Sequence, residues 1–290
     1  MDSLFLSLSL TAIVLSLWIL PNVYPVAGTL LLSLYAGYLG EISYSSIVVI
    51  FILAFAGYHF TLRNGDKNTV LRIILLMLVF WALLNEDYDG RMITWSGYMD
   101  MITNSKKFIV TLNFEKILAA TLLASYLYRP KLSLQYWQKI FTSAWSILFL
   151  VYVALLLPLT ILLHFFVDFN IGNGHLNTLL LNVFLVAFAE EVLFRGVLQN
   201  WLTQIIRIKI GVSASWIAIM LVSVLYGLVH VKYGFFIVLF SILVGGAYGY
   251  VYRKSGKIEV AILVHFAFSL TFCFVLAYYG HSDYLPVVVY

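Results

Sequence analysis

Residues 182–201 read NVFLVAFAEEVLFRGVLQNW, an apolar stretch that carries two glutamates and one arginine. The apolar segment around it, residues 178–205, is long enough to cross a bilayer, which takes about 20 residues. An ionised residue at the centre of a membrane helix costs roughly 2.5–3.5 kcal/mol, so Glu190, Glu191 and Arg195 would cost on the order of 7–10 kcal/mol if unpaired. Such residues normally face a bundle interior or a wet cavity. We therefore expect a helical bundle with a polar site inside it.

The composition of the chain agrees with a membrane protein. Of 290 residues, 63% are hydrophobic and 10% are charged, against about 25% charged in an ordinary soluble protein. A soluble domain of this length cannot hide so much apolar surface. A soluble enzyme, a disordered chain and a nucleic-acid-binding basic domain are therefore excluded. The single cysteine, Cys273, rules out an intramolecular disulfide and a cysteine-based zinc site.

Apolar segments of about the length of a membrane span recur along the whole chain. They predict an all-α fold, a polytopic transmembrane bundle of about 8–10 helices. The segment 111–128 is marginal because Asn113, Glu115 and Lys116 occupy its start. The ten segments are 4–20, 23–39, 45–62, 69–84, 111–128, 143–167, 178–205, 213–230, 234–252 and 258–279.

The basic residues between these segments are unevenly distributed. If the loops are assigned alternately to the two sides, one side holds eleven of the 17 Lys and Arg residues and the other holds four. The positive-inside rule places the richer side in the cytoplasm. The sequence therefore predicts a multi-pass protein of a prokaryotic cytoplasmic membrane with both termini outside. This orientation holds only if 111–128 is a span.

Helix geometry gives the three charges of the central stretch different roles. Glu191 and Arg195 are four residues apart, so they share a face and can pair. Glu190 lies about 100° around the helix from Glu191 and is left without a partner on its own helix. Glu190 is therefore the candidate acid/base, and Glu191 with Arg195 the candidate structural pair. The alternative is a buried ion-pair network that only locks helix packing.

Two further helices carry histidines with a polar residue on the same face. Tyr226 and His230 are four residues apart in MLVSVLYGLVHVK, and His265 and Ser269 are four apart in EVAILVHFAFSLTF. A Glu and a His can hold a water molecule and remove its proton. A second His and a hydroxyl can donate hydrogen bonds to a developing oxyanion. This combination of residue types favours hydrolysis of a peptide bond at or near the membrane.

The expected topology separates the two histidines along the membrane normal. His230 lies close to the outer end of its span, whereas His265 lies nearer the cytoplasmic end of its own. They can meet only if the boundaries at 213–234 differ from those predicted, or if one helix is tilted or broken. Gly227 and Gly234 flank His230 and would permit a bend.

With these three motifs in place, the sequence resembles the CPBP intramembrane proteases, a family that includes CAAX prenyl endopeptidases and bacteriocin-processing or self-immunity proteins. The family signature is Glu-Glu-x-x-x-Arg, then Phe-x-x-x-His, then His-x-x-x-Asn or a similar residue, on three transmembrane helices. Here Tyr226 replaces the Phe and adds a hydroxyl that needs a partner, and Ser269 replaces the Asn. The resemblance covers roughly 175–275, inside a catalytic bundle at 142–290. Residues 1–141 carry no part of it and form N-terminal helices of unknown role.

The resemblance implies roles for the motif residues. By analogy with the family, Glu190 and His230 activate the water, while His265 and Ser269 stabilise the oxyanion. Glu191 and Arg195 complete the site. A serine hydroxyl is shorter than an asparagine amide and offers one donor where the amide offers two, which puts the last role in doubt.

A metal ion is an alternative for the same site. Glu190, His230 and His265 can be interpreted as two-His-one-carboxylate zinc ligands, and the family has been described both as metalloprotease and as glutamic-type. No His-x-x-x-His pair within one helix supports the metal. We therefore expect no cofactor, with zinc as the alternative.

Three functions remain open at the level of sequence. The first is an endopeptidase that acts on a membrane-anchored protein or peptide within the lipid bilayer, with no nucleic-acid partner. The second is a non-catalytic membrane scaffold of the same fold that binds a membrane partner. Tyr226 and Ser269 favour the scaffold, whereas the intact Glu190, His230 and His265 set favours the protease. The third, a transporter or channel with Glu190 as ion site, lacks a visible internal repeat.

Overall fold

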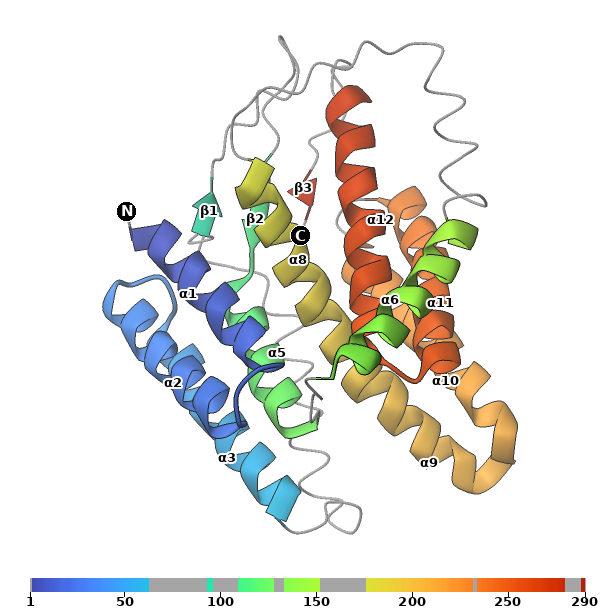
Figure 1. Cartoon of the computed structure of the whole chain (residues 1–290), viewed down its shortest axis with the longest axis horizontal. Helices are drawn as coiled ribbons and strands as arrows, with labels where there is room; N and C mark the ends of the chain where they lie inside the picture. Colours follow the sequence, from blue (N-terminus) through green and yellow to red (C-terminus); the bar gives the residue numbers. More distant parts are fainter. Residues whose placement is uncertain are drawn as a thin grey trace.

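The computed structural model describes residues 2–62, 93–95, 109–127, 133–151, 176–231, 234–279 and 288–289. Most of these residues lie in helices (Figure 1). The α-helices are α1 (Asp2–Ser16), α2 (Val23–Tyr38), α3 (Tyr44–Leu62), α5 (Phe114–Leu127), α6 (Leu134–Val151), α8 (Leu176–Glu191), α9 (Asn200–Ile210), α10 (Ala214–Val229), α11 (Phe235–Ser255) and α12 (Ile258–Tyr279). A π-helix, η3 (Val192–Gln199), joins α8 to α9, and a short 3₁₀ turn, η4 (Gly211–Ser213), joins α9 to α10.

The helix boundaries agree with most of the predicted apolar segments. Helices α1, α2, α3, α5, α10, α11 and α12 each begin and end within a few residues of one of them. Two segments differ. Helix α6 begins at Leu134, well before the predicted start at 143, and the predicted segment 178–205 is divided among α8, η3 and α9 and runs on to Ile210. Ser133 caps α6, with its hydroxyl accepting the Tyr136 N–H at 3.0 Å. Hydropathy marks where a chain becomes apolar, not where a helix begins. The predicted segment 69–84 and the part of 143–167 after residue 151 lie outside the described residues.

The described residues confirm the predicted helical fold class, and a small sheet adds to the helices. Three short strands, β1 (Ile93–Trp95), β2 (Ile109–Leu112) and β3 (Val288–Val289), form a small sheet in the order β1-β2-β3. Strand β2 pairs antiparallel with β1 and parallel with β3. Segments this short carry no alternation of apolar and polar residues that could be distinguished from loop, so the sequence pattern does not reveal them. Outside these strands the described architecture is helical.

Helix α5 lies at the centre of the N-terminal helices. It packs against α2, α3, α8 and η3 (Figure 1), and its residues from Phe114 to Ser125 are buried apart from Glu115. The Asn113 side chain caps it by accepting the Lys116 N–H at 2.8 Å. With 14 residues it is about 21 Å long, shorter than the roughly 30 Å hydrocarbon core. The charged residues that made this segment marginal therefore start a short, enclosed helix.

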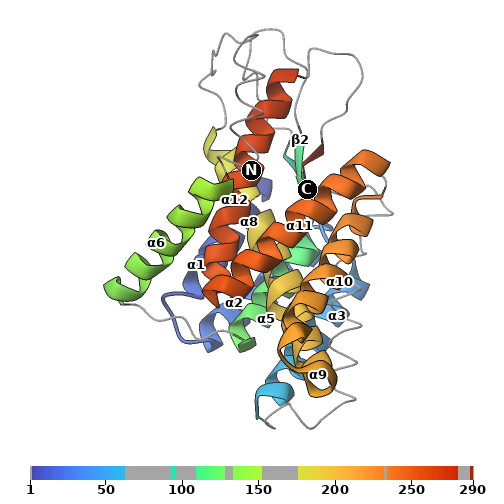
Figure 2. The same cartoon turned by 90° about the vertical axis from the view of Figure 1, so that its right-hand side faces the viewer.

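The C-terminal helices form the other side of the molecule. Helices α10 and α11 pack against each other along much of their length, and α12 packs against α8, α6 and α11 (Figure 2). A smaller core joins α6, α11 and α12 around Ile140, Tyr248 and Val264. Helix α11 ends at Gly256, which adopts φ +63° and so takes the left-handed conformation that ends a helix.

A change of helical type occurs in the motif helix directly after the glutamates. The chain is α-helical up to Glu191 and π-helical from Val192 to Gln199. π-Helical turns are rare and often lie at functional sites. This one includes Arg195, so the local change in winding sets the direction of the charged side chain relative to Glu190 and Glu191.

The outer faces of the described helices carry large apolar side chains. Ile208, Phe236 and Tyr38 are 88%, 85% and 83% exposed. Exposed apolar surface of this extent is typical of contact with lipid or a partner. Within the described residues, helix α11 is long and apolar enough to cross a membrane, and α2 and α10 are among the shorter apolar helices.

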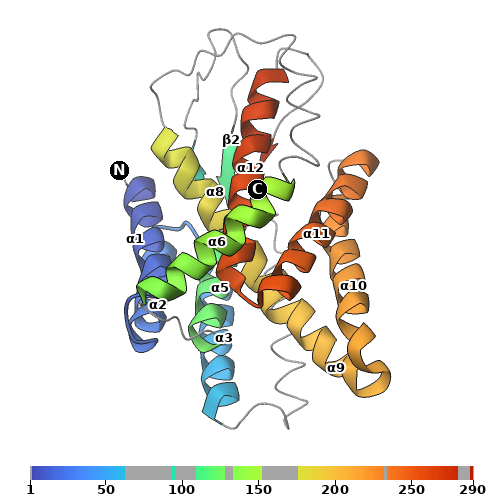
Figure 3. The ribbon, with the colours of Figure 1, turned by 45° about the vertical axis from the view of Figure 1, so that its right-hand side comes forward.

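The two motif histidines approach the same tyrosine, because the Tyr226 ring centroid lies 5.1 Å from that of His230 and 6.3 Å from that of His265. The boundaries of α10 agree with the predicted segment 213–230, so a wrong boundary is not the reason. Instead, α12 extends well beyond the level at which α10 ends (Figures 2 and 3).

Candidate active site

Glu190 lies where helices α5, α8, α10 and α12 meet. Its Oε1 atom accepts a hydrogen bond from the Lys116 ammonium at 2.8 Å, and its Oε2 atom accepts one from the Tyr226 hydroxyl at 2.9 Å. The Nε2 atom of His265 lies 3.8 Å from the same Oε2. Glu190 is only 3% exposed. The hydroxyl that Tyr226 adds to the motif thus finds its partner on the candidate acid/base.

Glu191 forms a second charged contact directly beside the first. Its Oε1 atom accepts a hydrogen bond from Nδ1 of His265 at 2.8 Å and lies 3.3 Å from the NH1 atom of Arg195. The predicted Glu191–Arg195 pair is therefore confirmed, and both side chains are fully buried. His265 bridges the two glutamates, with one ring nitrogen facing each carboxylate.

Arg195 is held by partners from two other helices. Its NH2 group donates to the Gly245 carbonyl at 2.8 Å. The guanidinium carbon lies 4.9 Å from the ring centroid of Tyr226 and 5.4 Å from that of Tyr248. A guanidinium between aromatic faces gains cation–π attraction that compensates part of its lost hydration. Arg195 thereby joins η3 to both α10 and α11.

His230 lies just beyond the last residue of α10, at the edge of the site. Its Nδ1 atom is 2.8 Å from the Tyr226 carbonyl oxygen. A carbonyl can only accept, so in the neutral ring the proton lies on Nδ1 and the lone pair on Nε2. His230 interacts electrostatically with Glu190, and it is more exposed than Glu190, Glu191 or His265. His230 is therefore the most exposed of these four side chains.

Ser269 reaches the site through a tyrosine. Tyr248 stacks on His265 with ring centroids 4.3 Å apart and an interplanar angle of 21°, and Ser269 is within hydrogen-bonding range of the Tyr248 phenol. Tyr226 contacts both Glu190 and His230, and His265 contacts both glutamates. Ser269 is linked to His265 through the Tyr248 side chain, whereas its predicted role requires it to face the oxyanion itself. That role stays a prediction.

The arrangement of donors does not form a metal-binding set. In the part of the chain that the structure describes, no group of three or more His, Cys, Asp and Glu residues is placed to hold a metal ion. The Glu190 Oε1 atom faces the Lys116 ammonium at 2.8 Å, where a second cation would be repelled. Glu190, His230 and His265 therefore do not fit a zinc site in this arrangement, and we derive no step through a metal.

Two residues of the site do not follow from the motifs. The sequence predicted no partner for Glu190 on its own helix, and Lys116 from α5 supplies one from another helix. The signal for Lys116 was present, because a charged residue inside an apolar segment is costly unless paired, but the segment offered no clue to its partner. Tyr248 carries no comparable signal, since it is one of 20 tyrosines in the chain.

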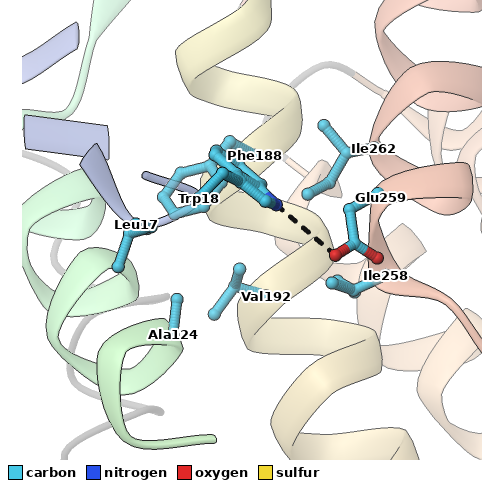
Figure 4. Close-up of a pocket in the computed structure, with 8 residues that line it drawn as sticks. All are labelled: Leu17, Trp18, Ala124, Phe188, Val192, Ile258, Glu259 and Ile262. Atoms are coloured by element: carbon cyan, nitrogen blue, oxygen red, sulfur yellow. Dashed lines mark hydrogen bonds between the residues drawn. The ribbon is translucent and has the colours of Figure 1, made fainter. Parts of the chain in front are cut away.

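A second polar cluster surrounds Glu259 in the first turn of α12. Its Oε1 atom accepts hydrogen bonds from the Tyr136 hydroxyl at 2.8 Å and from the Trp18 indole at 3.4 Å. Glu259 borders a small pocket between α1, α5, α8 and α12, walled by Trp18 and Phe188 (Figure 4). Burial, with the adjacent Glu259, raises the pKa of the Tyr136 phenol. This cluster fastens α6 and α1 to the start of α12.

Comparison with known proteins assigns the region that holds these motifs. Residues 173–271 match the family model of the type II CAAX prenyl endopeptidases, Rce1-like. The match covers about a third of the chain and includes all the motif residues. It confirms, for this segment, the resemblance to CPBP and CAAX proteases seen in the sequence. Searches of curated proteins and of solved structures gave no match.

The matched family is described as one of endopeptidases, which are hydrolases that act on peptide bonds. The similarity of residues 173–271 to this family points to a protease.

Proposed function

We propose that this protein is an intramembrane endopeptidase of the glutamic type that cleaves a membrane-associated peptide or protein. The observation that carries the proposal is the convergence of Glu190, His230 and His265 from three helices at one buried site, with His230 at its more exposed edge. Glu and His are the residue types that activate water. The site also lies in the segment that matches the family of proteases.

The proposed reaction uses a water molecule held between Glu190 and His230. The water oxygen attacks the peptide carbonyl carbon while its proton passes to the Glu190 carboxylate or to the Nε2 lone pair of His230. The carbonyl oxygen becomes an oxyanion. The same proton then moves to the leaving nitrogen as the C–N bond breaks, which yields a carboxylic acid and an amine.

The oxyanion needs donors that are already in place before the reaction. His265 is the first candidate, because its ring lies between the two glutamates and is held flat against Tyr248. Ser269 is the second, as the residue that stands where the family has asparagine. Ser269 lies close to the Tyr248 phenol. We therefore propose that these two hydroxyls together supply the donors that the asparagine amide supplies in the family.

The proposed setting is a bilayer. We infer that the helices form a polytopic bundle with the exposed apolar faces in lipid, which their large exposed side chains support. The substrate would then reach the site from the membrane. The cleavage test compares substrates that carry a prenyl group with substrates that do not.

A non-catalytic scaffold is the second candidate function. Both carboxylate oxygens of Glu190 already accept hydrogen bonds, from Lys116 and Tyr226, as a purely structural network would require. An ionised carboxylate offers about four acceptor positions, so these two contacts leave room for water. The protease therefore remains the better supported proposal.

The test is cleavage by purified protein in lipid vesicles. Membrane-anchored peptides, prenylated at a C-terminal CAAX cysteine or held by an apolar segment, are incubated with wild type, Glu190→Gln and Ser269→Asn, and products are identified by mass spectrometry. We expect wild type to cut one class of peptide and Glu190→Gln to lose at least about 100-fold in rate, since acid–base catalysis contributes about 10²–10⁴-fold.

The proposal fails if Glu190→Gln, folded and inserted, cuts as fast as wild type, or if wild type cuts neither class. Partner capture on the intact protein then tests the scaffold. Ser269→Asn reports on the oxyanion role. A faster reaction would mean that the serine limits the rate.

A further inference from the structure

Lys116 stands outside every motif of the site and outside the matched segment 173–271, yet it touches the central carboxylate. Its Nζ atom lies 2.8 Å from the Oε1 atom of Glu190, and the two side chains are 11% and 4% exposed. The contact joins residues 74 positions apart in the chain. Lysine is almost never buried unless it is paired, so the pairing with Glu190 accounts for its burial.

The location of Lys116 within α5 argues for a purpose beyond helix stability. It lies in the first turn of the helix, where the helix dipole disfavours a positive charge. The Asn113 side chain accepts the backbone N–H of Lys116 at 2.8 Å and so caps this turn. A lysine at this position therefore destabilises α5 taken by itself. Its ion pair with the Glu190 carboxylate on α8 compensates for that cost.

Lys116 and Tyr226 together clamp the Glu190 carboxylate. Lys116 donates to Oε1 and Tyr226 to Oε2, and the two donors come from different helices, α5 and α10. A carboxylate held at both oxygens cannot rotate about its last torsion. Its remaining acceptor positions therefore keep one direction in space.

We propose that Lys116 is a positioning residue of the active site, which fixes the orientation in which Glu190 accepts the proton of the attacking water. The inference rests on the proposed function. It also gives residues 1–141 a part in catalysis, because α5 must be docked before the carboxylate is oriented. Misplacement of a catalytic group by about 1 Å can cost roughly 100-fold in rate, so a clamp of this kind affects turnover more than substrate binding.

The test measures kcat and KM separately for Lys116→Met, Lys116→Arg and Thr121→Val, on the anchored peptide that wild type cuts. We expect Lys116→Met to lower kcat by about 100-fold with KM unchanged. Lys116→Arg keeps the charge but moves its donors, and we expect a smaller loss of kcat. Thr121 is the matched control, since it is buried on the same helix and its hydroxyl donates to the Ile117 carbonyl one turn earlier. Its variant should keep wild-type kcat.

Thermal unfolding of each variant separates positioning from folding. A kcat for Lys116→Met that equals wild type, or that falls only in proportion to the folded fraction, overturns the inference. If Lys116→Met does not accumulate in the membrane, Lys116→Arg decides the question, and a wild-type kcat for it overturns the inference. If Glu190→Gln is inactive while the Lys116 variants are fully active, the inference fails and the proposed function stands. If Glu190→Gln is fully active, both fail.

Discussion

Arg195 makes the pair of buried glutamates tolerable in the interior of the protein. It is fully buried, contacts Glu191, donates to the Gly245 carbonyl and lies against the rings of Tyr226 and Tyr248. Lys116 and Arg195 thus neutralise the charges of the two glutamates, one for each. A buried charge that loses its partner is costly, which makes Arg195 sensitive to substitution.

Replacement of Arg195 by Met should therefore destabilise the fold. We expect a loss of about 3–5 kcal/mol in the free energy of unfolding, because Glu191 would lose its cationic partner in a buried setting. Arg195→Lys should recover little, since an ammonium cannot reproduce the planar contacts of the guanidinium. Unfolding of the purified protein in detergent measures both.

Arg253 provides the matched comparison. Its guanidinium carbon lies 4.1 Å from the Trp216 ring centroid and its side chain bonds Ser215, but it is exposed. Exposed interactions of this kind contribute little, so Arg253→Met should unfold near the wild-type midpoint. Equal effects at positions 195 and 253 would contradict the central role given to Arg195.

Helix α11 presents glycines to its neighbours and uses the space for hydrogen bonds. The Gly245 carbonyl accepts from Arg195 and the Gly249 carbonyl accepts from Gln199, at 2.8 and 3.0 Å. The glycines are four residues apart, and so are the two donors on η3. The Gly-x-x-x-Gly of the sequence therefore does more than allow close packing, because it opens two backbone carbonyls to polar side chains of the motif helix.

Gly227 on α10 should tolerate no added methyl group. A Cβ atom at this position would lie 2.7 Å from the Val238 carbonyl oxygen and would overlap Ile242. Backbone cannot move aside as a side chain can, so α10 and α11 would have to separate. We expect Gly227→Ala to cost about 1–3 kcal/mol, as overpacking does, with a lower unfolding temperature.

Gly246→Ala is the control on the facing helix. A Cβ atom there would have only the Ser223 hydroxyl near it, at 3.6 Å. Alanine favours helix over glycine by up to about 1 kcal/mol, so this variant should unfold at the wild-type temperature or above it. A lower unfolding temperature for Gly246→Ala than for Gly227→Ala would show that the α10–α11 packing described here is wrong.

The two cores of the molecule meet around the charged site. The larger core joins α1, α2, α3 and α5 to α8, and the smaller one joins α6, α11 and α12. Lys116 comes from the N-terminal helices, whereas Arg195 and the histidines come from the C-terminal ones. The apolar side chains that do not enter either core face outward, where a bilayer would cover them.

Lipid contact of these outer faces is open to a direct test. Trp145 on α6 is 74% exposed, whereas Trp201 on α9 is 6% exposed. In vesicles of lipids with brominated acyl chains, which quench nearby indoles, Trp145→Phe should remove a large part of the quenched fluorescence. Trp201→Phe should leave the quenched part nearly unchanged. If the two substitutions have equal effects, or if no quenching occurs, the outer face of α6 does not lie in lipid.

The sequence by itself determined the helical character, the positions of most helices and the motif residues. Each of these depends on local properties. Long apolar stretches predict helices whatever their neighbours, and charged residues inside them stand out because of their cost in an apolar setting. The Glu191–Arg195 contact followed from the four-residue spacing within one helix, and the structure confirms it.

Only the tertiary structure decided which helices meet. The Lys116–Glu190 pair and the stacking of Tyr248 on His265 each join residues from separate helices. The offset of α12 relative to α10 is also a relation between helices. Helix geometry specifies which residues share a face of one helix. It does not specify which face of another helix packs against them. That choice depends on how the side chains of all the helices pack together, and it is made by the whole chain at once.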